Sequence, residues 1–148
     1  MEKQMNRLVE RLHQEGCSCV MSNQEVRTFE KRGVDDLYEL LTQEPDFLRG
    51  ADVADRVVGK AVAALLVKGG VQHVHADLIS LSALMLLREA GIDTEYDQVV
   101  TYIKNSHLTD WCPVEALCYN KETVDQVLSV VKQFVANKEQ FFKLQRQS

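Results

Sequence analysis

The spacing of apolar and polar positions predicts a chain in which helices and strands alternate. Residues 2–14 place Met5, Leu8 and Leu12 on one helical face, and Gly16 ends that helix. Later runs of apolar residues predict strands where they alternate and helices where they recur with helical spacing. In chain order the elements expected after the first helix are a hairpin of strands 17–22 and 25–30, a helix 35–41, a loop 45–50, a strand 71–79, a helix 81–90, one or two strands within 92–103, a helix opening at Cys112-Pro113, and a helix within 121–144.

The central stretch, residues 50–70, predicts one long buried helix. Its middle is almost wholly apolar, which is typical of a helix that is buried on more than one side. Asp52 stands where an N-cap is expected, and Gly69-Gly70 fit a left-handed helix end. At about 100° per residue, several residues of the first turns share one polar stripe, which also allows an ion pair from Asp52 to Arg56. These residues are Asp52, Asp55, Arg56, Gly59 and Lys60.

The order of these elements predicts an α/β fold. Strands that alternate with helices in the middle of the chain imply a partly parallel sheet with helices on both faces. The opening hairpin makes that sheet mixed. We expect a single domain over residues 1–148, with three layers and a mixed sheet of about five strands, in which the central helix is a crossover connection.

Composition narrows the classes of partner. The 148 residues carry a formal net charge of -5 and contain no basic run, so nucleic acid is not expected as a partner. Lys60 and Lys68 interrupt the longest apolar stretch, and the N-terminus lacks a signal-peptide pattern, so no membrane partner is expected either. The four cysteines form no CxxC motif, which favours reduced thiols and a cytoplasmic location.

Three segments carry a resemblance to a known family. They are EKRGVDDLYELL, LRGADVADRVVGKAVAALLVKGGVQHVHADLIS and TDWCPVEAL, within residues 28–118. They resemble a family of small, uncharacterised prokaryotic proteins, a domain of unknown function with a cytidine-deaminase-like fold. The most specific parts are VADRVVGKA and CPVE. The resemblance implies a cytidine-deaminase-like α/β fold and a ligand of nucleoside or nucleotide type.

The zinc motifs of cytidine deaminases are missing from the matching positions. Those enzymes carry His or Cys at the start of two helices, with a glutamate that moves the proton. Here the two positions read Asp52-Val53-Ala54-Asp55 and Ser80-Leu81-Ser82-Ala83. The resemblance therefore predicts no metal and no other cofactor at this place. It puts Asp55 where the family fold has a catalytic carboxylate.

The motif Cys112-Pro113-Val114-Glu115 is a candidate site at a helix start. Proline favours the first helical position, which places Cys112 at the N-cap and Glu115 at N3. The positive end of a helix lowers the pKa of a thiol and makes it a nucleophile or a redox-sensitive group, whereas Glu115 acts in the opposite direction. The alternative, slightly favoured, is a capping box with no chemical role.

Lys60 is the second candidate. An unpaired ammonium is costly in an apolar helix, so this side chain either reaches solvent, contacts a phosphate or carboxylate, or pairs with Asp55 or Asp52. Gly59 beside it favours close packing or the approach of a ligand. Asp52 and Asp55 also have a simple interpretation as helix caps.

Other polar groups have weaker support. His73, His75 and Asp77 would lie on one face of a strand, where they can bind a transition metal, although a solvent-facing strand side is the favoured interpretation. Cys17 and Cys19 are expected to share a strand face as buried free thiols. Trp111 can stack on a ring, and Asn105 in the same loop can reach a ligand.

The sequence thus predicts a small-molecule-binding domain and leaves open whether it is an enzyme. The candidate catalytic residues are Cys112, Asp55 and Lys60, and the candidate ligand-binding residues are Asp52, Gly59, Asn105, Trp111 and Glu115. The alternatives are a non-catalytic module that senses a ligand or partner, and a thiol-based redox protein that acts through Cys112. Phe141 and Phe142 near the C-terminus predict either a contact in a homo-oligomer or extra packing within the chain.

Overall fold

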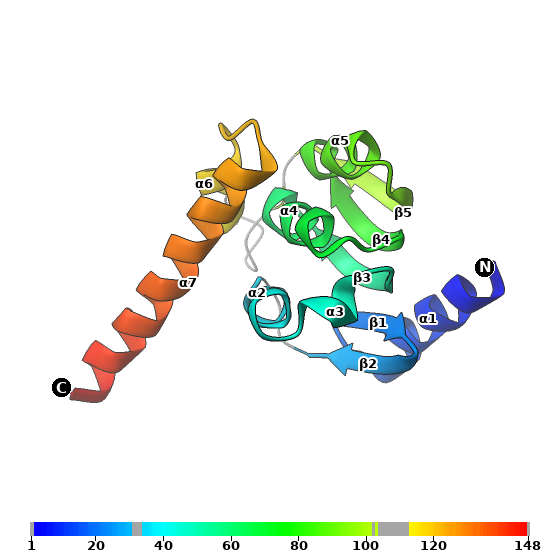
Figure 1. The fold of residues 1–148 in the computed structure, drawn as a ribbon, viewed down its shortest axis with the longest axis horizontal. Coiled ribbons are helices and arrows are strands. Elements are labelled where there is room, and N and C mark those ends of the chain that lie inside the picture. Colours follow the sequence, from blue (N-terminus) through cyan, green and yellow to red (C-terminus); the bar gives the residue numbers. More distant parts are fainter. Residues whose placement is uncertain (1, 31–33, 102, 104–112, 148) are drawn as a thin grey trace.

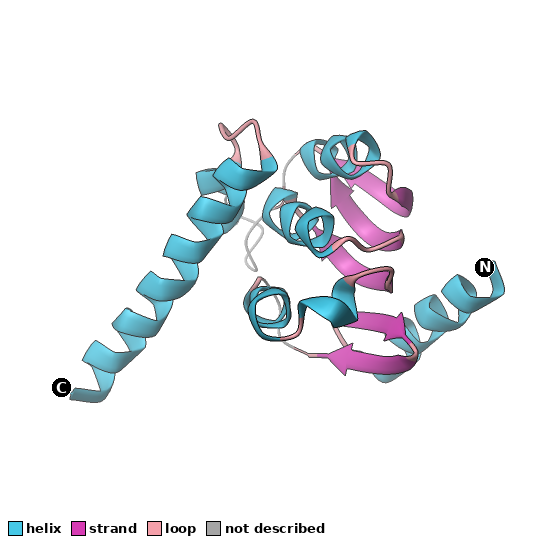
Figure 2. Ribbon diagram, in the orientation of Figure 1, coloured by secondary structure: helices cyan, strands magenta, loops and turns pink. Residues whose placement is uncertain are grey.

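A computed structural model of the chain describes residues 2–30, 34–101, 103 and 113–147. Within these ranges helices and strands alternate through the middle of the chain (Figures 1 and 2). The elements are α1 (Glu2–Glu15), β1 (Cys19–Asn23), β2 (Glu25–Phe29), α2 (Asp35–Gln43), α3 (Pro45–Leu48), β3 (Asp52–Val58), α4 (Lys60–Gly69), β4 (His73–Ser80), α5 (Leu81–Glu89), β5 (Asp93–Val100), α6 (Pro113–Cys118) and α7 (Val124–Gln147).

The strands form one mixed sheet in the order β2-β1-β3-β4-β5. β1 runs antiparallel to both β2 and β3, whereas β3, β4 and β5 are parallel. The two parallel connections each contain a helix, α4 and α5, as parallel neighbours require. The expected five-stranded mixed sheet and the expected hairpin are therefore confirmed.

Helices cover the two faces of the sheet unequally. Among the described helices, α1 is the one that packs on the first face, where Met5, Leu8 and Leu12 meet Val20 and Ala54. The other face carries the main core, formed with α2, α4 and α5, and α7 packs against the outer side of α4 (Figure 1). The far half of α7 extends away from the rest of the chain. No helix in the described part of the chain is both long and apolar enough to cross a membrane.

The single helix expected over residues 52–69 is wrong. Asp52–Val58 is the central strand β3, and the helix α4 begins only at Lys60, with Gly59 as its N-cap. Because β3 has strands on both sides and helices on both faces, its buried positions do not alternate, and such a run cannot be told from a buried helix by periodicity. The end of the helix is as expected, since Gly70 adopts a left-handed conformation with φ 78°.

Two smaller differences complete the comparison. Of the one or two strands expected within residues 92–103, the described residues form one, β5, and β3 supplies the remaining strand of the five-stranded sheet. A short helix, α3, occupies Pro45–Leu48 where a loop was expected, with proline at its first position.

Candidate functional site

Asp55 is a buried carboxyl group in the middle of the central strand. It lies opposite Cys19 on β1 and Ala76 on β4, and only 8% of its surface is exposed. Burial raises the pKa of Asp55 from 3.8 to about 7, because the charged form loses its hydration. Hydrogen bonds from the backbone of Val57 and Arg56 and from the Cys19 thiol oppose the shift, and the negative charge of Asp77 adds to it.

Cys19 is the partner that shares a proton with Asp55. Burial raises the pKa of its thiol well above the ordinary value, and the neighbouring carboxylate of Asp55 raises it further. Cys19 therefore stays protonated and donates to Asp55, so the pair holds one or two protons near neutral pH. Cys17 and Cys19 are both buried free thiols, as expected, but Cys17 packs with α1 and Cys19 belongs to the main core on the opposite side of the sheet.

Lys60 is the first residue of α4 and is also buried. Its Nζ donates to the backbone carbonyl oxygens of Tyr119, at 3.3 Å, and of Lys121. Both carbonyls follow α6, so the ammonium ties the start of α4 to the loop between α6 and α7. Of the alternatives for this side chain, the reach toward solvent is wrong, since the relative exposure is 9%.

The polar stripe expected on one helix is distributed over two faces of a strand. Asp55 lies on the α4 side of the sheet, whereas Arg56 points toward α1 and donates to the carbonyls of Leu12, at 2.9 Å, and Cys17, at 2.6 Å. Asp52 lies at the other end of β3 from Lys60, about 20 Å along the strand. It accepts from Gln72 at 3.1 Å and faces His73 Nδ1 at 2.7 Å. The Asp52 cap and the Asp52–Arg56 pair are therefore wrong.

Half of the candidate residues cannot be placed. Asn105, Trp111 and Cys112 lie outside the described residues, and Glu115 belongs to α6 without a described side chain. Their roles in catalysis or ligand binding remain predictions. The same holds for the homo-oligomer contact at Phe141 and Phe142, whose side chains in α7 are not described.

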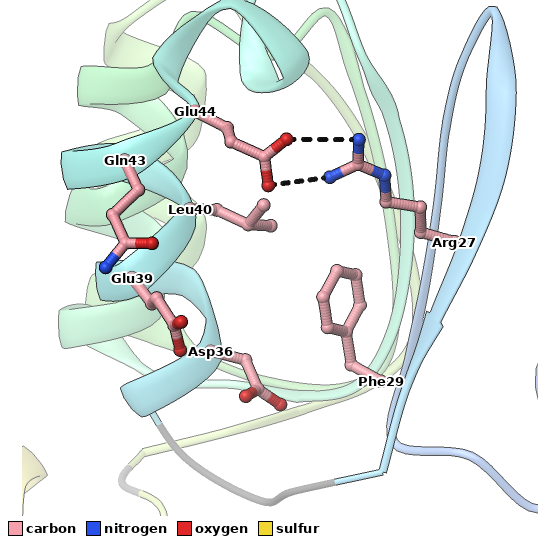
Figure 3. Close-up of a pocket in the computed structure, with 7 residues that line it drawn as sticks. All are labelled: Arg27, Phe29, Asp36, Glu39, Leu40, Gln43 and Glu44. Carbon is pink, nitrogen blue, oxygen red and sulfur yellow. Dashed lines mark hydrogen bonds and ion pairs between the residues drawn. The ribbon is translucent and has the colours of Figure 1, made fainter.

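A polar pocket lies between β2 and α2, a place that the sequence did not indicate. Figure 3 shows the residues that line it. Among them Arg27 forms a bidentate ion pair with Glu44, in which the two guanidinium Nη atoms lie 3.0 and 3.2 Å from the carboxylate oxygens. Its volume of about 190 Å³ is below the range of roughly 300–1,000 Å³ that is usual for small-molecule sites. Phe29 lines the pocket and lies opposite Cys19, and the charge of Asp36, also in the lining, raises the pKa of that thiol. The pocket is therefore a neighbour of the Cys19–Asp55 pair.

The histidines of β4 separate into two groups. His73 is engaged by Asp52, while His75 and Asp77 lie next to Asp97 of β5 on the same side of the sheet as α1. His13 of α1 also reaches Asp77, with Nε2 at 2.8 Å from Oδ2. The expected placement of His73, His75 and Asp77 on a strand is thus confirmed, but they do not act as one cluster.

Comparison with known proteins supports the fold as a whole. A DUF1893 family protein of Thermotoga maritima, TM1506, has a solved structure that matches with a TM-score of 0.81 and 26% identity, covering 90% of this chain and 91% of that one. RibD of Acinetobacter baumannii, form 2, matches with a TM-score of 0.43 and 16% identity, covering 65% of this chain and 34% of the other. No curated protein matches significantly. The family model for the domain of unknown function DUF1893 matches residues 7–135, so the chain belongs to the DUF1893 family.

Proposed function

We propose that this chain binds a small molecule and exchanges a proton with it through Asp55. One observation carries the proposal: Asp55, a buried carboxyl group of the central strand with its pKa raised to about 7, accepts a hydrogen bond from the buried thiol of Cys19 on the neighbouring strand β1. Strongly perturbed acids are frequent at functional sites, and a general acid or base works best with a pKa near the operating pH. In a strand that needed only a stable core, an apolar residue at this position would avoid the cost of burying a carboxylate.

We place the ligand on the α4 side of the sheet, between the start of α4 and α6. This placement rests on Lys60, a buried cation at the start of α4 whose bonds to the carbonyls of Tyr119 and Lys121 fix its ammonium beside the end of α6. Gly59, the buried N-cap of α4, brings no side chain to this place, so its backbone can lie close to a neighbouring group. In this proposal Lys60 contacts an anionic or carbonyl group of the ligand, and Trp111 and Cys112, which directly precede α6 in the sequence, take part in binding it.

A nucleoside or nucleotide is the first ligand class to test. This choice rests on the resemblance of VADRVVGKA and CPVE to a cytidine-deaminase-like family, with Trp111 as the ring that would stack on a base. The three described cysteines are free thiols, which supports a reducing compartment, and we propose the cytoplasm.

The test is a binding and turnover screen with the full-length chain. Nucleosides and nucleotides are added to the wild type, to Asp55→Asn and to the control Asp93→Asn, which removes an exposed carboxylate from β5. We expect the wild type and the control to bind the ligand equally. The rate of any turnover should depend on pH with a pKa near 7, and Asp55→Asn should abolish this turnover. Unchanged turnover in Asp55→Asn would refute the catalytic role.

The same screen separates the alternative functions. Binding without turnover in the wild type would make the chain a ligand sensor. A thiol-based redox role predicts instead that Cys112 is alkylated near neutral pH faster than Cys17, Cys19 and Cys118, which mass spectrometry measures. The buried positions of these three thiols make them the slow reference for that comparison.

A further inference from the structure

The side of the sheet that faces α1 carries a compact group of metal-ligating side chains. One nitrogen of His75 and one carboxylate oxygen each of Asp77 and Asp97 lie within 4.8 Å of one another. They come from neighbouring parallel strands, β4 and β5, whose register pairs Ala76 with Tyr96 and so places Asp77 beside Asp97. Residues that alternate along a strand share a face, so His75 and Asp77 project to the same side.

Both ring nitrogens of His75 face carboxylate oxygens, so one of the two contacts joins two acceptors. Its Nδ1 lies 3.2 Å from Glu95 Oε1 and its Nε2 lies 3.1 Å from Asp77 Oδ1. A neutral imidazole has one N–H and one lone pair, so it satisfies only one of these two carboxylates. At the second contact the ring nitrogen without a proton faces a carboxylate oxygen, and a cation between these two acceptors would ligate both. This ring is nearly buried, with 7% of its side chain exposed, so water does not readily supply the missing donor.

Glu95 gives His75 the environment of a metal ligand. Metal-bound histidines almost always donate the other ring N–H to a carboxylate or carbonyl, which fixes the tautomer and aims the free nitrogen at the ion. Here Nδ1 faces Glu95 and Nε2 faces Asp77, so the free nitrogen points into the cluster. His13 from α1 contacts both oxygens of Asp77, with Nε2 at 2.8 Å from Oδ2 and 3.0 Å from Oδ1, so a bound ion would share this carboxylate with His13.

The local charge is also favourable for a cation. Asp77, Glu95 and Asp97 bring three carboxylates to a small area that contains the ring of His75. Arg56 occupies the neighbouring position on β3, but its guanidinium donates to the carbonyls of Leu12 and Cys17.

We propose that His75, Asp77 and Asp97 form a binding site for a divalent transition-metal ion such as Mn²⁺ or Zn²⁺. An imidazole with two carboxylates suits these ions, and three protein ligands leave coordination positions for water. Bonds of about 2.1 Å bring two ligand atoms to within roughly 4.2 Å of each other, so the exposed Asp97 turns inward by several tenths of an ångström on binding. The site lies on the opposite face from Asp55 and does not depend on the function proposed above.

The test measures metal binding by the full-length chain after treatment with a chelator. Mn²⁺ binding is followed by the loss of the electron-paramagnetic-resonance signal of the free ion, and Co²⁺ binding by visible absorption. Asp97→Asn is the main variant, because an exposed position tolerates the change, and His75→Gln is the second. Asp93→Asn is the matched control, an exposed carboxylate four residues earlier in β5. We expect one ion per wild-type chain, binding weakened at least about tenfold in both site variants, and unchanged binding in the control.

Three results would overturn the proposal. The first is no stoichiometric binding by the wild type, which would leave a hydrogen-bonded network that holds α1 on the sheet. The second is equal weakening by Asp97→Asn and Asp93→Asn, which indicates diffuse attraction to a negative surface. The third is a thiolate charge-transfer band with Co²⁺, which would place the ion on cysteine.

Discussion

Asp55→Asn is the substitution whose effect follows most directly from the structure. The variant keeps the shape of the side chain and removes its charge at every pH. Because burial raises the pKa of Asp55 from 3.8 to about 7, the native state binds a proton that the unfolded state has released within this range. The contribution of Asp55 to the free energy of unfolding is therefore fully present below pH 3.8 and is lost as the pH rises to about 7.

The magnitude follows from the size of the shift. Each pKa unit corresponds to about 1.4 kcal/mol, so the rise from 3.8 to about 7 amounts to roughly 4 kcal/mol. Wild type should lose this amount across the range, and Asp55→Asn should not. The variant therefore gains on the wild type by up to roughly 4 kcal/mol between the acid and the neutral end.

Urea denaturation of both proteins in thiol-reducing buffer measures this difference. The series begins at the lowest pH at which both remain folded and ends above pH 7. Subtracting the two curves removes the titration of the histidines, which both proteins share. A difference that stays constant with pH, within about 1 kcal/mol, would refute the buried, protonated Asp55.

Three further substitutions test the packing around the site. Arg56→Ala removes the donors to the carbonyls of Leu12 in α1 and of Cys17 just after it. The substitution should lower the free energy of unfolding by about 2 kcal/mol and speed amide exchange in α1. Arg11→Ala, which breaks an exposed ion pair, should change the free energy of unfolding by less than about 1 kcal/mol, and equal effects of the two would contradict the role of Arg56. Lys60→Met leaves the carbonyls after α6 without their donor and should speed amide exchange in α6, with the exposed Lys68→Met of the same helix as control. Gly69→Ala places a Cβ 2.8 Å from the Leu48 side chain. The overlap should lower the free energy of unfolding by about 1–3 kcal/mol and so lower the melting temperature, and a higher melting temperature would contradict this prediction.

The candidate site shows how one wrong element changes the expected contacts. As a helix, residues 52–60 would put Asp52, Asp55 and Lys60 on one stripe. As a strand, they put Asp52 with His73, Asp55 with Cys19, and Lys60 at the far end with carbonyls of a distant loop. The three charged residues that the sequence indicated are all buried in the structure, which is uncommon for charged side chains. Their partners follow from the pairing of strands and not from their spacing.

The sequence by itself determined the elements whose signals are local. These elements are the amphipathic face of α1, the hairpin of β1 and β2, and the glycine end of α4, each of which depends on residues a few positions apart. Tertiary structure decided that residues 52–58 form a strand. A central strand that is covered on both faces is buried at successive positions, so its sequence lacks the alternation of apolar and polar residues that identifies a strand. Tertiary structure also decided the ionisable contacts, such as His13 with Asp77 across 64 positions and Asp55 with Cys19 across the sheet. Such contacts arise only when the sheet brings distant segments together and removes water from between them.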